Sequence, residues 1–462
     1  MVTPEPGSLT ESLPELVRSL GDDVALTDPD ALERYRFDWS RDPDAGMPAA
    51  VVRARDANDV QTAVRWAAQH KVPVVPRGAG SGLSGGSSAV DQGIVVSLDQ
   101  MKAVEIDTAC RVAVVEPGAL NAEVKEAAAK EGLWYPPDPS SFEICSIGGN
   151  VATNAGGLCC VKYGVTTDYV LGLDVVLADG RLITLGGKRI KDVAGLSLLK
   201  LFVGSEGTLG IITRAILRLV PAQGERATLV ASFASMTDAS RAVVAIGAEV
   251  RPSMMELMDN ASINAVEDWK SHGLDREAGA LMVAQSDAPG AARELELSVM
   301  EKACAAAGAT EVAVTSDAEE SAMFVSARRN AFIALEQKGT LLLEDVGAPI
   351  PLLPDLVDGI AAIAAKHDVQ IPVVAHAGDG NTHPIIVFDP DDPEVADRAA
   401  LAFAEVMKLA ISLGGTITGE HGVGRTKKAA LPEQLGEDLM ELSWTVKRAL
   451  DPDHILNPGA VL

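Results

Sequence analysis

The chain of 462 residues is poor in positive charge and has no long apolar run. Its 39 Lys and Arg residues stand against 65 Asp and Glu residues, which gives a formal charge of -26. This charge repels phosphate backbones and therefore argues against nucleic acid as a partner. No uninterrupted apolar stretch approaches the roughly 20 residues that a membrane helix needs. We expect no transmembrane segment.

The sequence also lacks a disulfide pattern and a targeting signal. Its five cysteines are odd in number and show no CxxC spacing, which is typical of reduced thiols in a cytosolic enzyme. The first 20 residues carry Glu5, Glu11 and Glu15 and no basic, apolar leader. We therefore expect a cytoplasmic protein. The length and the 47% hydrophobic content predict two or three globular domains.

A glycine-dense segment at residues 77–86 follows a predicted strand–helix–strand unit at residues 49–76. Gly80, Gly82 and Gly85 match the GxGxxG spacing of dinucleotide-binding proteins. That interpretation requires a helix directly after the glycines, but the chain continues with Ser, Gly and Asp into an apolar strand. What remains is a loop of backbone N–H groups that can hold a pyrophosphate without a helix behind it.

Two further glycine-rich segments lie at residues 145–157 and 204–210. The composition of the first predicts neither a helix nor a central strand. Three such loops in the first half of the chain indicate one large ligand that the backbone approaches from several sides. Ordinary turns in a glycine-rich chain are the alternative.

After Pro221 the pattern changes to longer amphipathic helices, such as residues 236–249 and 353–366. They alternate with predicted strands, such as residues 280–285 and 340–346. A second α+β domain begins there.

Two histidines flank a tight turn in this second domain. With residues 378–381 as a four-residue loop between two strands, His376 and His383 would be cross-strand partners roughly 5 Å apart. Imidazoles at that distance can share one metal ion.

A third metal ligand is offered by Glu420, in the segment Gly-Glu-His-Gly-Val-Gly at residues 419–424. Its glycines let the backbone approach a ligand closely, and His421 is left as a base. Two histidines and one carboxylate suit zinc, manganese or iron with coordination positions left open.

Six motifs taken together resemble those of the FAD-linked 2-hydroxyacid dehydrogenases. This branch contains D-lactate dehydrogenase, the glycolate oxidase flavin subunit and D-2-hydroxyglutarate dehydrogenase. The motifs are residues 76–86, 137–154, 204–213, 376–383, 419–424 and 456–459. The match spans nearly the whole chain, in order.

The resemblance implies an α+β fold of the vanillyl-alcohol-oxidase or PCMH type. A two-part FAD-binding domain would occupy residues 1–221, with its core at about 46–221, and a substrate-binding cap would occupy residues 222–411. A C-terminal segment at residues 412–462 would complete the active site and pack on the FAD domain.

The resemblance also implies which residues bind the cofactor, with the pyrophosphate on the first glycine loop and further contacts on the other two loops and the tail. These residues are Arg77, Gly78, Ala79, Gly80, Ser81, Gly82, Leu83, Pro137, Asp138, Ser141, Ser146, Gly148, Gly149, Asn150, Thr153, Asn154, Glu206, Gly207, Ile211 and Asn457. Relatives that bind flavin covalently often place a histidine where this chain has Ser81. We therefore expect non-covalent FAD.

In the cap, the resemblance agrees with the spacing argument. His376, His383 and Glu420 resemble ligands of a divalent metal, with zinc favoured and manganese or iron as alternatives, and His421 resembles the catalytic base. Arg328 resembles the arginine that binds the substrate carboxylate. Arg329 is the alternative, because adjacent residues point in opposite directions on a strand and the sequence does not fix the register.

The activity implied is oxidation of a small D-2-hydroxy acid, D-lactate or glycolate, to the 2-oxo acid. His421 would remove the hydroxyl proton and the flavin N5 would accept the hydride. Phe332 and Leu343 stand where hydroxyglutarate enzymes bind the distal carboxylate, which favours a monocarboxylate. A D-2-hydroxyglutarate dehydrogenase is the alternative within the family, and a zinc metallohydrolase with structural glycine loops is the alternative from another class.

The electron acceptor is left open between a quinone, a cytochrome and an electron-transfer flavoprotein. Through that acceptor the protein would be peripheral to a membrane. A homodimer is one option for its assembly, and a flavin subunit of a larger complex is another.

Overall fold

The computed structural model describes residues 8–462, so the part of the leader expectation that concerns residues 1–7 lies outside it. Two compact units make up the chain. The first comprises the chain up to residue 156, residues 165–222 and residues 420–462; the second comprises residues 157–164 and 223–419. The expected cap domain was residues 222–411. The second unit differs from it because it also contains residues 157–164 and continues to residue 419.

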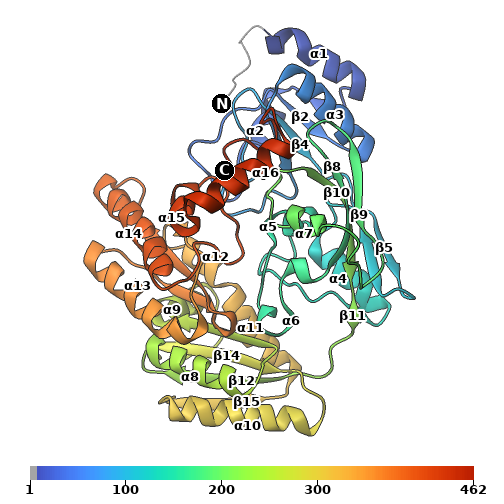
Figure 1. Ribbon diagram of the computed structural model, residues 1–462. Helices are drawn as coiled ribbons and strands as arrows, with labels where there is room; N and C mark the ends of the chain where they lie inside the picture. Colours follow the sequence, from blue (N-terminus) through green and yellow to red (C-terminus); the bar gives the residue numbers. More distant parts are fainter. Residues whose placement is uncertain (1–7) are drawn as a thin grey trace. The chain divides into compact units, whose positions relative to one another are not determined.

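The first unit is built from short strands and helices (Figure 1). Its elements are α1 (Ser8–Leu20), β1 (Ala25–Leu26), α2 (Pro29–Arg34), β2 (Ala50–Arg53), α3 (Ala57–His70), β3 (Val74–Arg77), β4 (Ile94–Ser97), β5 (Val104–Asp107), β6 (Val112–Val115), α4 (Asn121–Lys130), β7 (Leu133–Trp134), α5 (Ile147–Thr153), β8 (Val170–Val176), β9 (Leu182–Gly186), α7 (Leu198–Phe202), β10 (Ile211–Arg218), β11 (Val220–Pro221), α15 (Leu431–Leu435) and α16 (Glu437–Leu450).

The second unit has longer elements. They are α6 (Cys160–Tyr163), β12 (Ala227–Phe233), α8 (Met236–Glu249), β13 (Met254–Asp259), α9 (Asn260–Trp269), β14 (Ala280–Ser286), α10 (Ala291–Ala306), β15 (Glu311–Thr315), α11 (Ala318–Arg329), α12 (Ala331–Glu336), β16 (Thr340–Leu343), β17 (Val346–Gly347), α13 (Leu353–His367), β18 (Val373–His376), β19 (Asn381–Phe388) and α14 (Pro393–Ser412).

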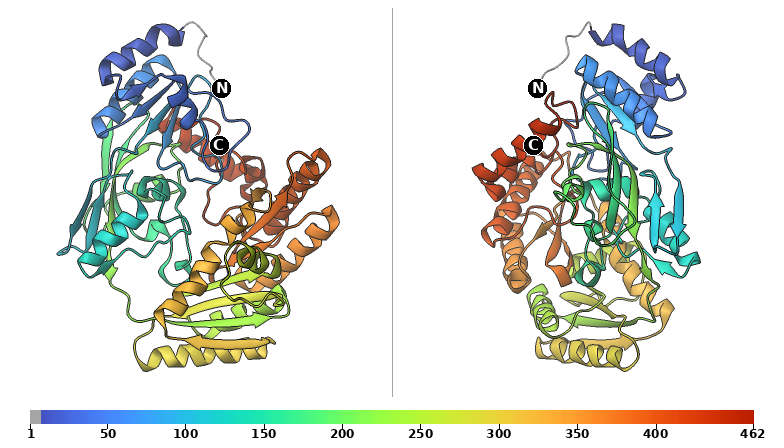
Figure 2. Two further views of the ribbon diagram at one scale, coloured as in Figure 1. Left: turned by 180° about the vertical axis from the view of Figure 1, so that it is seen from behind. Right: turned by 45° about the vertical axis from the view of Figure 1, so that its right-hand side comes forward.

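A four-stranded sheet in the order β1-β2-β4-β3 carries the first glycine loop. Strands β2, β4 and β3 are parallel, and β4 is buried along its whole length, as expected for a parallel strand covered on both faces. Helix α3 begins where the Asp56 side chain accepts hydrogen bonds from two backbone N–H groups, and it ends at Lys71 in the left-handed region. The expected strand–helix–strand unit is confirmed. Figure 2 shows α3 beside this sheet.

An antiparallel five-stranded sheet in the order β5-β6-β10-β8-β9 forms the other half of the first unit. The hairpin expected at Asp179-Gly180 joins β8 to β9, and Gly180 adopts a positive φ of 76°.

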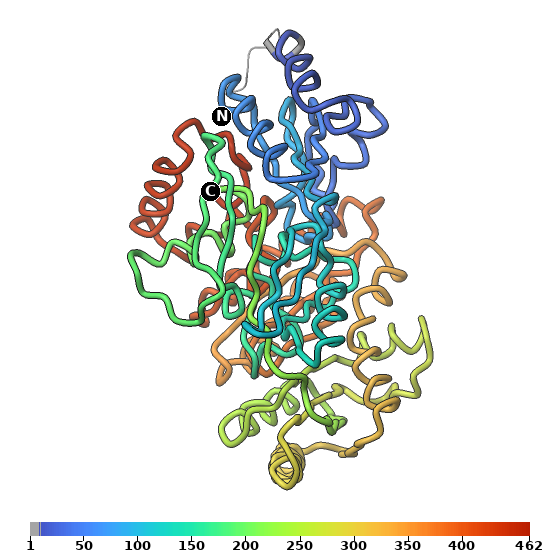
Figure 3. The backbone as a smooth tube through the Cα atoms, turned by 90° about the vertical axis from the view of Figure 1, so that its right-hand side faces the viewer, coloured from blue at the N-terminus to red at the C-terminus, as the bar shows by residue number. Residues whose placement is uncertain are grey.

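The C-terminal tail returns to the first unit, as expected. Leu456 forms a parallel bridge with Val74, and the Asn457 N–H donates to the Val74 carbonyl at 2.7 Å. Ile455 and Leu456 belong to the same hydrophobic cluster as the four-stranded sheet and α3. In the backbone trace of Figure 3 the C-terminal residues are drawn in red and the residues of the four-stranded sheet in blue.

The second unit is one antiparallel sheet in the order β15-β12-β14-β13-β18-β19-β16, with β17 also paired to β19. Residues of α8, α10 and α13 form one hydrophobic cluster with the sheet, and residues of α9, α11 and α12 form another. Because successive strand residues face opposite sides, the two clusters cover the two faces. The predicted strand at residues 340–346 is interrupted at Glu344 and Asp345.

Candidate active site

The loop after β3 leaves a row of backbone donors unused. The N–H groups of residues 80–83 donate no hydrogen bond within residues 8–462, and Gly80 has a positive φ of 73°. Arg77, 8% exposed, lies against this loop: a Cβ on Gly80 would fall 2.1 Å from its Nη2 atom. Burial lowers the pKa of Arg77, which Asp38 partly opposes. Unused N–H groups over a buried cation fit a pyrophosphate.

No helix follows this loop, because the chain runs from β3 directly into β4. The rejection of the Rossmann interpretation is therefore confirmed. The other residues predicted for this loop, Gly78, Ala79, Ser81, Gly82 and Leu83, are partly exposed or exposed.

The expectation of no helix at residues 145–157 is wrong, because α5 forms there. Ser146 caps it by accepting a hydrogen bond from the Gly149 N–H, and Asn154 ends it at a φ of 55°. A Cβ on Gly148 would lie 2.5 Å from Pro117, so the glycine permits close packing. Packing here outweighs the low helix propensity of glycine. Ser146 Oγ also accepts from the Ala79 N–H at 3.1 Å, which joins α5 to the first loop.

Several residues predicted to contact FAD here also make contacts within the protein. The Asn150 side chain bonds to Asn121 at 3.0 Å, and Thr153 donates to Gly149 O at 3.1 Å. Pro137 O accepts from Asn121 at 3.3 Å. Asp138 is buried, and the Ser141 carbonyl accepts from two following N–H groups. Their cofactor contacts stay a prediction.

The third loop and the tail are tied together by Asn457. Its Nδ2 donates to the carbonyls of Gly86 at 2.8 Å and Glu206 at 2.7 Å, and its Oδ1 accepts from Arg425 at 3.2 Å. Gly207 lies against Pro76, and Ile211 is buried in the core. Asn457 therefore holds the glycine loops in place, whatever its contact with the flavin.

The histidine hairpin forms with a different register from the one predicted. His376 pairs with Asn381, and His383 pairs with Val374, so the two histidines are diagonal neighbours and the cross-strand pairing was wrong. The reason is a 3-10 turn at Ala377–Asp379, closed by Gly380 at a φ of 82°. A shift of two residues keeps both side chains on one face. Their ring centroids lie 5.1 Å apart, which confirms the expected proximity.

A buried carboxylate that the sequence analysis missed connects His376 to Arg328. Both oxygens of Glu256 lie 2.9 Å from His376 Nδ1, and one lies 3.0 Å from Arg328 Nε. All three side chains are at most 5% exposed. Glu256 lies on β13, and the pairing of β13 with β18 brings it beside the hairpin. The only sign of Glu256 in the sequence is a single acidic residue within an apolar strand, Met-Met-Glu-Leu-Met.

Arg328 and Arg329 lie in the last turn of helix α11, so the strand assumed for them is wrong. Asp317 caps this helix, and its first turn is acidic. Adjacent helix residues are about 100° apart rather than opposite. Arg328 is buried and Arg329 is partly exposed.

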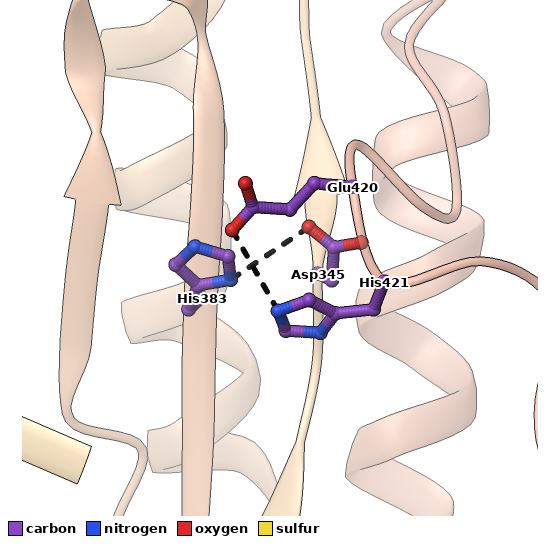
Figure 4. A group of neighbouring side chains, drawn as sticks. All are labelled: Asp345, His383, Glu420 and His421. Carbon is purple, nitrogen blue, oxygen red and sulfur yellow. Dashed lines mark ion pairs between the residues drawn. The ribbon is translucent and has the colours of Figure 1, made fainter. Parts of the chain in front are cut away.

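Four side chains form a group that could hold a metal ion (Figure 4). Asp345, His383, Glu420 and His421 each offer one ligand atom, and these atoms lie within 4.8 Å of one another. His383 Nδ1 lies 3.7 Å from Asp345 Oδ1, and His421 Nε2 lies 3.7 Å from Glu420 Oε1. Imidazole and carboxylate ligands of this kind suit zinc, manganese or iron.

Asp345 is the member of this group that the sequence analysis missed. Its Oδ1 accepts from Asn381 at 2.9 Å, and its Oδ2 accepts from Thr418 at 2.7 Å. Its carbonyl accepts from the N–H of Gly419, directly before Glu420. The available signal was an acidic pair, Glu344 and Asp345, that ends an apolar strand.

Comparisons with known proteins match both halves of the chain to FAD-linked families. A family model described as "FAD binding domain" matches residues 48–186, and one described as "FAD linked oxidases, C-terminal domain" matches residues 222–461. The glycolate oxidase subunit GlcD of Bacillus subtilis is 41% identical over 416 residues, covering 89% of this chain and 88% of the relative.

The chain belongs to the FAD-linked oxidases. D-lactate dehydrogenase of Archaeoglobus fulgidus is 34% identical over 442 residues, which cover 93% of this chain and 96% of the relative. This FAD-linked oxidase is an oxidoreductase with FAD as its cofactor. The alternative of a metallohydrolase with purely structural glycine loops is wrong.

Solved structures confirm the fold class. p-Cresol methylhydroxylase has a TM-score of 0.83 at 18% identity, covering 99% of this chain and 97% of that one. 4-Ethylphenol oxidase from Gulosibacter chungangensis has a TM-score of 0.81 at 19% identity, covering 100% and 98%. These FAD-linked proteins show the vanillyl-alcohol-oxidase type of fold. Among the described residues, no helix is long and apolar enough to cross a membrane.

Proposed function

We propose that this FAD-linked oxidase is a metal-dependent dehydrogenase that converts a small D-2-hydroxy acid to its 2-oxo acid. The observation that carries the proposal is the group of imidazoles and carboxylates within 4.8 Å in a member of this family. Relatives named glycolate oxidase subunit GlcD and D-lactate dehydrogenase support the substrate class. D-Lactate and glycolate are the favoured substrates.

His376, His383 and Glu420 are the proposed ligands of the metal, with zinc favoured. His383 and Glu420 belong to the group of four side chains, whereas His376 is not one of the four and is proposed because its ring centroid lies 5.1 Å from that of His383. Such an ion, when bound, polarises a substrate oxygen and lowers the pKa of a hydroxyl. Asp345 is proposed to orient His383, because both of its carboxylate oxygens already accept hydrogen bonds from Asn381 and Thr418.

Arg328 is proposed to bind the substrate carboxylate. A guanidinium matches a carboxylate with two parallel hydrogen bonds. The Glu256 carboxylate holds one edge of this guanidinium, so its orientation is set before the substrate arrives. Burial strengthens the interaction with an incoming anion, because the local dielectric is low.

His421 is proposed to accept the proton of the substrate hydroxyl. Its backbone carbonyl accepts a hydrogen bond from Ser84 Oγ at 3.1 Å, and its ring lies within the group formed with Asp345, His383 and Glu420. A histidine exchanges protons near neutral pH, as this role requires.

A small monocarboxylate is favoured over a dicarboxylate. Phe332 and Leu343 pack against the hydrophobic cluster of the second unit, and neither offers a polar atom to a second carboxylate. D-2-hydroxyglutarate is the second candidate substrate.

FAD, when bound, supplies the acceptor for the hydride. The predicted contact residues of the three loops and the tail would hold it, apart from the side chain of Glu206, whose two oxygens already accept from backbone N–H groups. Ser81 offers no imidazole for a covalent bond. We therefore propose non-covalent FAD. Precipitation in acid tests this: the yellow colour should stay in solution, and colour in the pellet would contradict it.

The partner that reoxidises the flavin is proposed to be a quinone, a cytochrome or an electron-transfer flavoprotein. A homodimer, or a complex with further subunits, is the proposed assembly, since two relatives carry the name of a subunit.

Steady-state dye reduction tests the function. Glycolate, D-lactate, L-lactate and D-2-hydroxyglutarate should be compared before and after treatment with a metal chelator and after zinc is restored. The proposal expects turnover with D-lactate or glycolate that the chelator removes and zinc restores. Turnover that survives complete removal of metal would contradict the metal dependence.

A further inference from the structure

Glu206 is a buried carboxylate that binds the backbone close to His421. Its Oε1 accepts from the Val423 N–H at 2.8 Å, and its Oε2 accepts from the Gly424 N–H at 2.9 Å. The residue is only 8% exposed. Both oxygens are therefore bonded to the segment that contains the proposed base.

The backbone of Glu206 is itself fixed from two directions. Its N–H donates to the Ala152 carbonyl of α5 at 2.8 Å, and its carbonyl accepts from Asn457 Nδ2 at 2.7 Å. Glu206 has a φ of 49°, a conformation that is costly for a residue other than glycine. Surroundings that hold a residue in this conformation define the direction of its side chain.

The glycines around Glu206 make room for this carboxylate. A Cβ on Gly422 would lie 2.8 Å from Oε1, and a Cβ on Gly86 would lie 3.1 Å from Oε2. A Cβ on Gly424 would lie 1.9 Å from the Ser84 carbonyl. In Gly-Glu-His-Gly-Val-Gly, Gly422 therefore permits contact with Glu206 and Gly424 permits contact with Ser84.

We propose that Glu206 is a positioning residue for the proposed base and metal ligand. Its carboxylate binds the backbone two and three residues after His421. These bonds set the backbone position of Glu420 and His421, from which the two side chains extend. The inference rests on the proposed function, because it assigns Glu206 to those two residues. It also replaces the expectation that the Glu206 side chain contacts FAD.

The test compares Glu206→Gln and Glu206→Asp with the wild-type holoenzyme. Glutamine keeps the length but offers one acceptor oxygen and an NH2 donor, so one of the two N–H groups loses its partner. Aspartate keeps the charge but is shorter by one methylene, so it serves as a second variant if glutamine prevents folding.

Glu267→Gln is a matched control. The Glu267 carboxylate on α9 is also buried: its Oε1 accepts from the N–H groups of His272 at 2.7 Å and Leu274 at 3.0 Å, and its Oε2 accepts from Ser271 Oγ at 3.1 Å. This variant removes a buried carboxylate whose partners are not proposed site residues, so it should lower the thermal stability and change kcat less than about twofold.

For Glu206→Gln we expect kcat to fall by roughly 10- to 100-fold, the effect of misplacing a reacting group by about 1 Å. KM and the FAD content should stay close to wild type. Hydrogen exchange of the peptide that covers residues 420–425 should become faster, and Glu206→Asp should show the same changes.

Two results would overturn the proposal: loss of FAD with unchanged exchange at residues 420–425, or faster exchange with wild-type kcat. An equal fall of kcat in Glu267→Gln would also overturn it. If the wild type oxidises no 2-hydroxy acid, the proposed function fails, and the exchange rates and metal content then decide the positioning role. Faster exchange with weaker metal binding supports it, and unchanged exchange overturns it.

Discussion

The Nδ1 atom of His376 lies 2.9 Å from both carboxylate oxygens of Glu256. A carboxylate accepts hydrogen bonds only, so in the neutral ring Nδ1 carries the proton and Nε2 is the atom that presents a lone pair. Histidines that bind metals commonly have a carboxylate at the other nitrogen. This pair fixes the ring of a proposed metal ligand in the orientation and tautomer that such a ligand requires.

Glu256→Gln should weaken metal binding by about 10- to 100-fold, the usual cost of losing a carboxylate behind a ligating histidine. The change also removes the charge that balances the buried Arg328, so the melting temperature should fall. Zinc titration of the metal-free protein and thermal unfolding measure the two effects, with Glu267→Gln as the control. Wild-type zinc affinity in Glu256→Gln would show that Glu256 is not coupled to the metal.

Arg328→Ala should lower kcat/KM, because the transition state loses about 1.5 to 3 kcal/mol of stabilisation, the contribution of a hydrogen bond to a charged group. That corresponds to roughly 10- to 150-fold. Arg329→Ala is the matched variant one residue away and should have little effect. Initial rates at several concentrations of D-lactate measure both. The opposite pattern would assign the carboxylate to Arg329.

His383→Ala and His376→Ala should each abolish stable metal binding, because each removes a proposed ligand. Asp345→Asn should only weaken it, by about 10- to 100-fold, because Asp345 is proposed to orient His383. Elemental analysis after dialysis measures the metal content of the three variants and distinguishes loss of a ligand from weaker binding. Full metal retention in His376→Ala would remove His376 from the ligand set, and complete loss in Asp345→Asn would make Asp345 a ligand.

His421→Ala should lower kcat by roughly 10² to 10⁴, the usual contribution of a positioned base. The FAD content should not change, because no FAD contact is proposed for this side chain. Turnover and the flavin absorbance of the same preparation provide the measurement. Near-normal turnover would show that another group takes the hydroxyl proton.

Burial raises the pKa of Glu206 to about 7, although the N–H groups of Val423 and Gly424 oppose the shift. The folded state therefore keeps a proton that the unfolded state has lost between pH 4.5 and 7. The protonated Glu206 side chain therefore contributes its full stabilisation below pH 4.5, and this stabilisation is lost as the pH rises through about 7. The total is on the order of 3 kcal/mol. Unfolding of wild type and Glu206→Gln across this range measures it, and parallel curves would contradict it.

The sequence predicted the elements whose pattern is local. The strand–helix–strand unit and the Asp179-Gly180 hairpin formed as expected, since each depends on apolar periodicity or turn chemistry. The return of the tail was expected from the family resemblance, because its contact with Val74 is long-range. Helix α5 was missed because the contact of Gly148 with Pro117 is a tertiary feature that propensity does not contain. The register of His376 was missed because a 3-10 turn replaced a simple loop.

The candidate site was predicted in part, and its supporting carboxylates were not. Glu256 and Asp345 reach His376 and His383 only through strand pairing, with Glu256 on β13 beside β18. Residues far apart in the chain meet there, and a single sequence carries no signal for that pairing. The family resemblance placed Glu206 among the cofactor contacts, and in the structure its side chain accepts from the N–H groups of Val423 and Gly424.

Anaerobic mixing with 2-hydroxy acids tests the central claim most directly, because it needs no electron acceptor. The holoenzyme should be mixed in turn with D-lactate, glycolate, L-lactate and D-2-hydroxyglutarate while the flavin absorbance near about 450 nm is followed. Bleaching by D-lactate or glycolate, with release of the 2-oxo acid, is the predicted result. A flavin that stays oxidised with all four acids in a metal-loaded preparation would contradict the account.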